Sequence, residues 1–375
     1  MSPNSTREEP LVIIGEADSD GNPLAHIISG PGGDAVRLTE LAEYPDIDTD
    51  NIYFLSLRVT GSRSGFFLGS APMSLIGRQL SNILVADCII DGMYDHKTQT
   101  DLTANLPFLS NALASKWGIF TGPITGSAIV FNTIENVKRE HAIYAHMGGS
   151  NGDLVDAVDY YDTDPFIFGA NTITEVGRTE GQFTARAEET FGDPELAANR
   201  VPIIYAMNYS TDNALAPGDG CKGGSGNSYY GNHRSPIFTT LNLFRSGYDD
   251  LNPGLADAVR ENCNLSTPFT GAIRNTAYEN DGAQSEEIHM IDNIVTFAPD
   301  AGDRELVRFS GVKRAFIENN TIQAGATGIA LELADSQVYG PMEAYCVKGN
   351  QISGSTELPN GQAIVQPAGF NVNCE

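Results

Sequence analysis

Two short stretches of the chain concentrate side chains that can exchange protons or balance a negative charge. They read HAIYAH, from His141, and GQFTAR, from Gly181, and they are expected to lie side by side, with His141 beside Gly181 and His146 beside Arg186. If both are strands, alternate residues face opposite sides, and the apolar residues Ile143, Ala145 and Phe183 are expected to point inward. The same alternation predicts an outward-facing set made of Tyr144, His146, Gln182, Thr184, Arg186 and Glu332.

This outward-facing set suits removal of a proton beside a carboxylate. Such an elimination needs a cation to neutralise the carboxylate, a base to take the proton and an acid to protonate the leaving oxygen. We expect Arg186 to supply the cation, His146 the base and Tyr144 the acid, in β-elimination of a uronic-acid polymer. The alternative is that Tyr144 and His146 are ordinary exposed positions bonded to loop residues.

Further titratable groups flank these stretches. Arg139 and His141 are additional catalytic candidates at the edge of the same site, although alternation places His141 on the inward side. Glu188 and Glu189 could bind Ca²⁺ together with an aspartate of the acidic loop 148–164, because calcium favours several oxygen ligands. That loop lacks EF-hand spacing, and the competing interpretation is a solvated acidic loop.

A loop rich in Gly, Ser and Tyr is expected at 210–235. Its candidates for substrate binding are Lys222, Tyr229, Tyr230, His233 and Arg234. Aromatic and charged side chains grouped in this way suit stacking on sugars and recognition of hydroxyl groups. They suit equally well a loop that merely packs across the surface.

The elements that must position these groups are short strands joined at asparagine-marked corners. The stretch 315–333, AFIENNTIQAGATGIALEL, reads as a strand, an Asn corner, a second strand, a Gly-rich turn and a third strand. The segments NIYFLSLRVTG and NILVADCIIDG, which begin at Asn51 and Asn82, align with each other. Similar corners recur at Asn132, Asn171, Asn242, Asn293, Asn320 and Asn350.

Such a unit cannot bury its apolar side alone, so the units are expected to stack. Asparagine tolerates the left-handed backbone conformation at a bend. Stacked asparagine side chains can also hydrogen-bond to one another, as ladders do in cross-β assemblies. These repeats predict an all-β fold, a right-handed single-stranded parallel β-helix solenoid with loop insertions and one or two short helices.

The Asn-x-Ile corners and the IENNTI phrase resemble the right-handed parallel β-helix, or pectin-lyase-like, superfamily. The resemblance extends over roughly Leu11 to Gln366. It implies the fold more than one activity, because that superfamily includes polysaccharide lyases, glycoside hydrolases, epimerases, esterases and phage tailspikes. The paired-Asp and Gly-His-Gly pattern, the Arg-x-Pro-x-Arg element and the Asp-Pro-His-Glu element of three of its branches are absent from the sequence.

One domain is expected over residues 11–375, after a disordered or capping segment at 1–10. Long loops are predicted on one side of the solenoid, at about 97–116, 148–164, 210–235 and 251–264, with a short helix in the first and the last. Loops on a rigid scaffold are where binding sites usually lie.

The charge balance limits the partners. The chain has 22 Lys+Arg against 48 Asp+Glu, a net charge of −26. Such a chain lacks the basic surface that nucleic acids or anionic membranes require, so neither is expected as a partner. A polyanionic substrate would require a local basic groove.

The cysteines predict an oxidising setting. Cys88 lies in an apolar run and is expected to pack as a small hydrophobic residue. The remaining four suggest the pairs Cys221–Cys263 and Cys346–Cys374. The first residues have no apolar core typical of a signal peptide, so an extracellular protein would have lost its leader or would be part of a virion.

Three functions therefore compete. The leading one is a polysaccharide lyase. The second is a glycoside hydrolase that uses a carboxylate pair, with candidates such as Glu140, Glu188 and Asp292. The third is a non-catalytic, glycan-binding β-helix of the tailspike or adhesin type. The expected partner is a polysaccharide, and the chain is expected to be a monomer or a homotrimer.

Overall fold

The computed structural model shows an all-β protein. The structure describes residues 9–29, 33–38, 50–61, 63–68, 80–92, 117–122, 124–135, 137, 141–146, 164–174, 179–184, 202–211, 227–232, 237–246, 273–276, 285–297, 307–323, 329–335, 341–359, 362–365 and 370–372. Within these ranges the regular elements are strands, and no helix occurs. The short helices expected in 97–116 and 251–264 lie outside the described residues.

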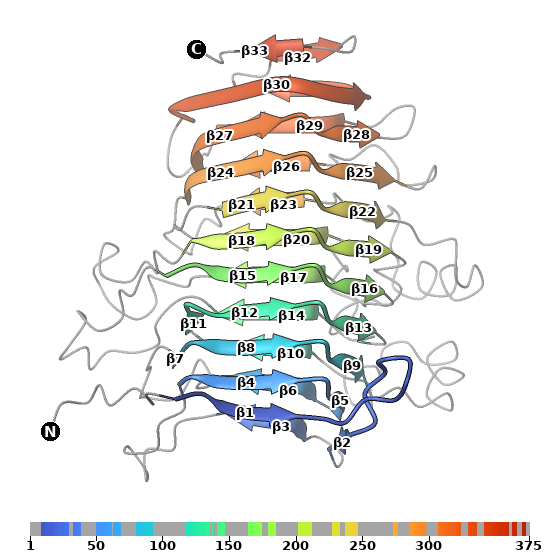
Figure 1. Ribbon diagram of the computed structural model, residues 1–375. Helices are drawn as coiled ribbons and strands as arrows, with labels where there is room; N and C mark the ends of the chain where they lie inside the picture. The colour runs from blue at the N-terminus through green and yellow to red at the C-terminus, as the bar shows by residue number, and fades with distance from the viewer. Residues whose placement is uncertain are drawn as a thin grey trace, which may run out of the picture.

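The strands are arranged in three sets, which follow one another in turn along the chain (Figure 1). The first sheet consists of β1 (Leu11–Ile14), β4 (Ile52–Leu55), β8 (Ile83–Ala86), β12 (Ala128–Val130), β15 (Phe166–Gly169), β18 (Ile203–Ala206), β21 (Ile237–Thr240), β24 (Ser285–Ile291), β27 (Val312–Glu318) and β30 (Ala344–Ser353). The second sheet consists of β2 (His26–Ile28), β5 (Arg58–Gly61), β9 (Ile89–Gly92), β13 (Thr133–Glu135), β16 (Thr172–Thr174), β19 (Tyr209–Thr211), β22 (Leu243–Ser246), β25 (Ile294–Phe297) and β28 (Thr321–Gln323), and it joins the first through β30.

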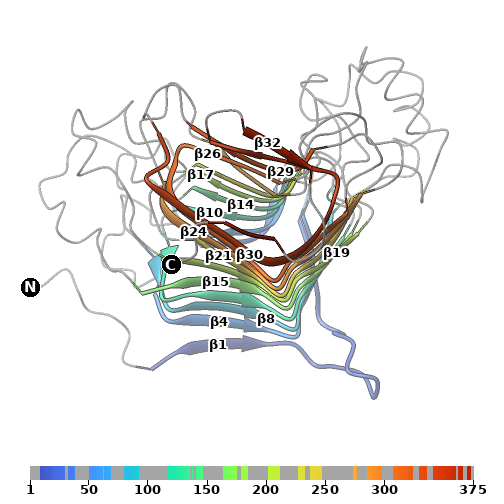
Figure 2. The ribbon, with the colours of Figure 1, turned by 90° about the horizontal axis from the view of Figure 1, so that it is seen from above.

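The third sheet has 11 strands. They are β3 (Asp34–Leu38), β6 (Ser64–Leu68), β10 (Trp117–Thr121), β14 (His141–His146), β17 (Thr179–Thr184), β20 (Asn227–Asn232), β23 (Ile273–Thr276), β26 (Val307–Ser310), β29 (Ile329–Ala334), β31 (Ser355–Leu358) and β32 (Gln362–Val365). Two short strands, β7 (Leu80–Ser81) and β11 (Ile124–Thr125), pair with each other. Viewed from above, the first and third sheets lie on opposite sides of a common interior (Figure 2).

We refer to three consecutive strands, one in each sheet, as a rung. Strands of successive rungs pair in parallel, and the register confirms the repeat expected from the sequence: Ile52 pairs with Ile83 in the first sheet, and Gly61 pairs with Gly92 in the second. The stretch 315–333 likewise divides into β27, β28 and β29, as predicted. Inward-facing residues of all three sheets form one apolar core.

A ladder of buried asparagines runs through this interior, as the sequence predicted. Its members are Asn132, Asn171, Asn208, Asn242, Asn293, Asn320 and Asn350, each at most 3% exposed. Each Nδ2 donates to the Oδ1 of the next asparagine along the chain at 2.9–3.1 Å. The same Oδ1 also accepts the backbone N–H of the donating residue, at 2.8–3.1 Å.

Two positions of the ladder, Asn208 and Cys88, are not among the corners recognised in the sequence. Asn208 is followed by Tyr and Ser, and it lies 37 residues after Asn171 and 34 before Asn242. Cys88 begins the series: its backbone N–H donates to Asn132 Oδ1 at 3.0 Å, and its thiol lies 3.8 Å from the Phe54 carbonyl. The prediction that Cys88 packs as a buried apolar residue is confirmed, because it is 1% exposed in the core.

The left-handed conformation expected of the ladder asparagines belongs instead to the residue before each of them. Phe131, Ala170, Met207 and Leu241 have φ between 53° and 60°. The asparagine must point inward to bond its neighbours, so the preceding residue makes the turn. Because that residue points outward, Phe131, Met207 and Leu241 are more than half exposed.

The parallel stacking ends at the last rung. Residues 363–366 were expected to continue the stack, but β32 pairs with β31 in antiparallel orientation, and β33 (Phe370–Val372) does the same with β30. A returning strand satisfies backbone groups at the edge of a sheet, which would otherwise be open to pairing with another chain. Of the remaining cysteines, Cys346 lies buried on β30, whereas Cys221, Cys263 and Cys374 lie outside the described residues.

Replacing Asn208 by Ala should interrupt the ladder. The change leaves the backbone N–H and Nδ2 of Asn171 without their acceptor, and two buried hydrogen-bond donors without partners cost about 3 kcal/mol in all. We expect a loss of that size in the free energy of unfolding, measured in denaturant. Thr172→Ala, at an exposed position, should change it by less than about 0.5 kcal/mol. Equal losses in the two variants would contradict a stabilising ladder.

Cys88 should react with alkylating agents only after unfolding. Burial raises the pKa of its thiol from 9.0 to about 11. Two pKa units reduce the reactive thiolate about 100-fold below pH 9, in addition to the loss of access. Peptide mapping after iodoacetamide treatment at pH 8 should show Cys88 unmodified in the native protein and modified in denaturant. Comparable modification in both states would contradict this placement.

Candidate functional site

The outer face of the third sheet carries the residues that the sequence singled out. Ile143 and Ala145 of β14 are fully buried in the core, and Tyr144 between them is half-buried on the outside, as alternation predicted. Leu331 of β29 is buried and Glu332 faces out in the same way. The predicted outward orientation is therefore confirmed for Tyr144 and Glu332.

The register between β14 and β17 differs from the expected one by two residues. Tyr144 pairs with Gln182, and His146 pairs with Thr184, whereas the alignment of the sequence placed His146 beside Arg186. The error arose because the corners were used as the reference, and the connection from the corner to the strand differs in length between the two rungs. A shift of two residues preserves the face. Arg186 lies outside the described residues.

His141 lies on the outer side, not on the inner side that alternation predicted. Both Ala142 and Ile143 belong to the core, so alternation is interrupted at the start of β14. The equivalent position of the neighbouring strand behaves alike, since a side chain on Gly118 would meet Ile134 in the interior. The His141 ring stacks on Tyr144 at 5.4 Å and 19°, and it is 1% exposed.

Tyr144 belongs to an aromatic row that crosses three rungs. Phe67 stacks on Phe120 with ring centroids 4.7 Å apart and an interplanar angle of 12°. Trp117 lies 4.8 Å from Phe120 and stacks on Tyr144 at 6.0 Å and 10°. We call Phe67, Trp117, Phe120, Tyr144 and His141 the aromatic row. Phe67, Phe120 and Tyr144 occupy equivalent positions of three successive strands, so their side chains line up along the sheet.

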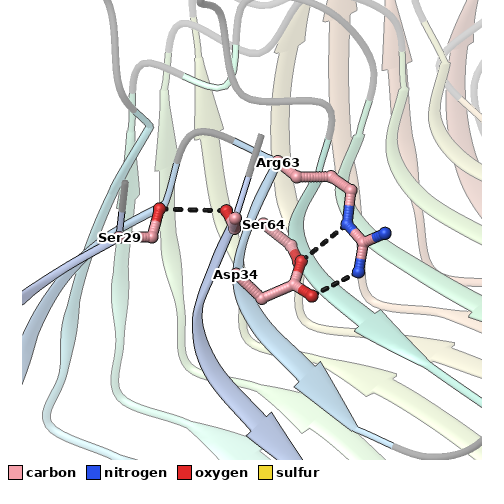
Figure 3. Close-up of polar contacts among 5 residues, drawn as sticks. Ser29, Asp34, Arg63 and Ser64 are labelled. Carbon is pink, nitrogen blue, oxygen red and sulfur yellow. Dashed lines mark hydrogen bonds and ion pairs between the residues drawn. The ribbon is translucent and has the colours of Figure 1, made fainter. Parts of the chain in front are cut away.

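Two arginines flank this aromatic row at its N-terminal end. The guanidinium carbons of Arg37 and Arg63 lie 5.1 Å and 5.0 Å from the centre of the Phe67 ring. Arg63 is fixed by an ion pair in which its Nε donates to Asp34 Oδ1 at 2.8 Å, and Ser64 Oγ donates to the same carboxylate (Figure 3). Asp34 is only 3% exposed, whereas Arg37 is exposed.

The backbone around this cluster is held by one carbonyl. Ser29 Oγ and the backbone N–H of Arg63 both donate to the Gly33 oxygen, each at 2.9 Å (Figure 3). The turn that leads into β3 is therefore tied to the start of β6. The guanidinium group of Arg63 consequently has a defined position beside Phe67.

The residues that pair in register with Tyr144, strand after strand, form a row that runs toward the C-terminus. Successive partners are Gln182, Tyr230, Arg274, Arg308, Glu332 and Glu357. Arg308 and Glu332 form an ion pair, with Nε 3.4 Å from Oε2. The interpretation of 210–235 as a loop is wrong for 227–232, because this segment is β20 and places Tyr229 and Tyr230 in the third sheet.

Several predicted site residues lie outside the described residues. They are Arg139, Arg186, Glu188, Glu189, Lys222, His233 and Arg234. His146, Gln182, Thr184, Tyr229 and Tyr230 are placed by the register of their strands. The described parts of the chain contain no group of three His, Cys, Asp or Glu side chains arranged to hold a metal ion, and the proposed Ca²⁺ ligands Glu188 and Glu189 are not among them.

Sequence reasoning missed most of the aromatic row. Trp117 is the single tryptophan of the chain, and it begins the strand segment WGIFT in which alternate residues are bulky. Phe67 lies in SGFFLG, where two consecutive aromatic residues cannot both face the core of a strand. The sequence therefore contained a signal for Trp117 and one for Phe67. The approach of Arg63 to Phe67 depends on pairing between rungs, which the sequence does not show directly.

The arrangement can bind a planar or ring-shaped ligand that carries negative charge. Aromatic faces attract the C–H surface of sugars and similar rings, and guanidinium groups recognise carboxylates by paired hydrogen bonds. The phenol of Tyr144 can donate a proton to a leaving group. Because Phe67, Phe120 and His141 are at most 3% exposed, the groups of this face that a ligand can reach are the partly exposed Trp117 and Tyr144 and the exposed Arg37.

Comparison with known proteins identifies no relative. No family model, no curated protein and no solved structure matches this chain. The described residues include no helix that could span a membrane. Any functional conclusion must therefore depend on the geometry of the site itself.

The two arginines beside Phe67 should differ in their effect on stability. Arg63→Ala removes the partner of a buried carboxylate, which should lower the free energy of unfolding by about 2 kcal/mol after allowance for the half-exposed guanidinium. Arg37→Ala, at an exposed position over the same ring, should cost less than about 1 kcal/mol. Denaturant titration of both variants checks this.

A double variant provides the control for that pair. Asp34→Asn removes the buried negative charge, so the combination Asp34→Asn with Arg63→Ala should recover part of the lost stability. An effect of Arg63→Ala no greater than that of Arg37→Ala would contradict the importance of the ion pair.

Proposed function

We propose that the rungs form a right-handed parallel β-helix of the pectin-lyase-like type. The support comes from parallel pairing in successive rungs, from one interior lined by three sheets and from the asparagine ladder. A solenoid of this kind presents a long, regular outer surface on which an extended polymer can lie.

On this scaffold we propose that the protein binds an acidic polysaccharide along the outer face of the third sheet. The observation that carries the proposal is the aromatic row with Arg37 and Arg63 at its end. The partly exposed rings of Trp117 and Tyr144 would support the faces of successive sugars, and Arg37 would meet a carboxylate of the polymer. Because Asp34 balances the charge of Arg63, Arg37 supplies the local positive charge in a chain whose net charge is −26.

The proposed reaction is β-elimination at a uronic acid. In this scheme Arg186, the residue expected from the sequence, neutralises the sugar carboxylate, and the phenol of Tyr144 protonates the leaving oxygen. Arg37 and Arg63 lie against Phe67, two strands away from Tyr144, so they would contact a neighbouring sugar instead. His141 is buried against Tyr144, so we assign it to positioning that ring, and His146 keeps the role of base. Polymers of this kind occur outside cells, which is where we propose that the protein acts.

A hydrolase is the second candidate. Glu332 and Glu357 are register neighbours on the outer face of the third sheet, and adjacent strands are about 4.8 Å apart, close to the carboxylate separation of retaining glycosidases. Of the earlier candidates, Glu140 and Glu188 lie outside the described residues. Asp292 lies at the corner between the first and second sheets, away from this face.

Incubation with a panel of uronate polymers and neutral glycans tests the function. A lyase releases unsaturated products, detected by ultraviolet absorbance, whereas a hydrolase releases reducing ends without that absorbance. Quenching or enhancement of the Trp117 fluorescence would report binding, since Trp117 is the single tryptophan and lies in the aromatic row. Neither a fluorescence response nor any product across the panel would contradict the proposed function.

Tyr144→Phe separates chemistry from binding. The variant keeps the ring but loses the hydroxyl, so the elimination rate should fall by about 100-fold or more while the fluorescence titration is unchanged. Arg37→Ala should instead weaken binding by about fivefold or more, because an exposed charge that meets a polymer carboxylate is lost. Tyr209→Phe, on the second sheet, is the matched control and should leave both measurements unchanged. Wild-type elimination in Tyr144→Phe would refute the assigned acid.

A further inference from the structure

The outer face of the first sheet is apolar over successive rungs. Inward-facing neighbours such as Phe54, Val85 and Phe168 are buried in the core, so the residues between them face out. The residues in register along the centre of this face are Tyr53, Leu84, Ala128, Ile167, Ile204 and Phe238, each partly exposed. We call this set the apolar stripe.

The outward row beside the apolar stripe is also uncharged over the same rungs. It runs from Leu55 through Val130 to Thr240. Charged side chains appear on this face only toward the C-terminal end, where Arg314 pairs with Glu287 at 3.0 Å. A strand face that meets water is usually polar, so two adjacent uncharged rows require a physical reason.

The second sheet shows that this is not a general property of the rungs. Its outward positions in the same part of the chain include Arg58, Asp91, Thr133 and Thr172 as well as Ile89 and Tyr209, and Arg58 donates to Asp91 at 2.8 Å. Its outer face is therefore mixed, with charged and polar groups between the apolar ones. Both sheets belong to the same rungs and share one core. The difference therefore concerns what each outer face contacts.

The dimensions of the face suit a protein interface. From β1 to β21 its uncharged part crosses seven rungs, and at about 4.8 Å between strands and about 3.3 Å per residue this part measures about 29 Å by 13 Å, or about 380 Å² in projection. Contiguous exposed apolar patches of a few hundred Å² commonly mark interaction sites. Specific interfaces bury about 600–1,000 Å² on each partner, so the contact would extend from this apolar part onto the C-terminal rungs.

The shape and charge of the face indicate the occupant. The stripe is straight and repeats at each rung, so a compact globular partner would cover only a few of its rungs. A second copy of the chain presents the same straight apolar stripe, which is self-complementary about a two-fold axis. With a net charge of −26 on each copy, an uncharged face is also where two copies approach with the least repulsion.

We propose that two copies of this chain associate side by side through the outer faces of their first sheets. The third sheet lies on the opposite side of the rungs (Figure 2), so association through the first sheet would not cover it. This proposal does not depend on the proposed function, because it concerns a different face and different residues.

Sedimentation velocity of the full chain over a range of concentrations tests it. We expect an assembly larger than the monomer, which Ile204→Lys and Ala128→Lys should each weaken by at least about tenfold in dissociation constant, because each lysine charge is buried between copies. The matched control is Thr172→Lys, which adds the same charge on the outer face of the second sheet and should leave association unchanged.

Far-ultraviolet circular dichroism shows whether each variant is folded. Because the two substitutions lie in different rungs, one variant still tests the proposal if the other does not fold. A monomer at every concentration would overturn the proposal. So would lysine variants that fold and associate as tightly as the unmodified chain, because the copies would then meet through another face.

Discussion

The buried asparagine ladder is the interaction on which the arrangement of the rungs depends. An amide with two N–H groups and one oxygen is costly to bury unless its hydrogen bonds are made. In Asn171 the Nδ2 donates both to Asn208 and to the Ile129 carbonyl, and its Oδ1 accepts from Asn132. A slip of one residue at the corner would break these bonds together, so the ladder fixes the register of the strands of the first and second sheets that flank it.

A fixed register turns single residues into rows. Because each residue lies beside its equivalent in the next rung, the same type of residue at one position of successive rungs gives a whole face its character. The three outer faces differ accordingly. The first sheet is apolar, the second is mixed, with ion pairs such as Arg58–Asp91, and the third carries aromatic rings with arginines. The same core supports all three, since inward positions are apolar in each sheet.

The third sheet also shows where local reasoning reaches its limit. The sequence identified Tyr144 and its outward orientation, because alternation of apolar residues needs only the strand itself. It failed for His141, since an interruption of alternation at the start of β14 is set by how Ala142 fits against the neighbouring sheets. It also failed for the neighbour of His146, because the length of a connecting segment does not show how far the chain advances before it pairs.

The sequence by itself determined the strand–corner repeat, the class of fold, the inward and outward faces of most strands and the asparagine ladder. These are local or periodic properties, and each is written in consecutive residues. Only the tertiary structure decided that Asn208 completes the ladder, that Arg63 and Asp34 meet beside Phe67, and that Trp117 stacks on Tyr144. Those residues are remote in sequence, and their contacts exist only because stacked rungs bring equivalent positions within about 4.8 Å of each other.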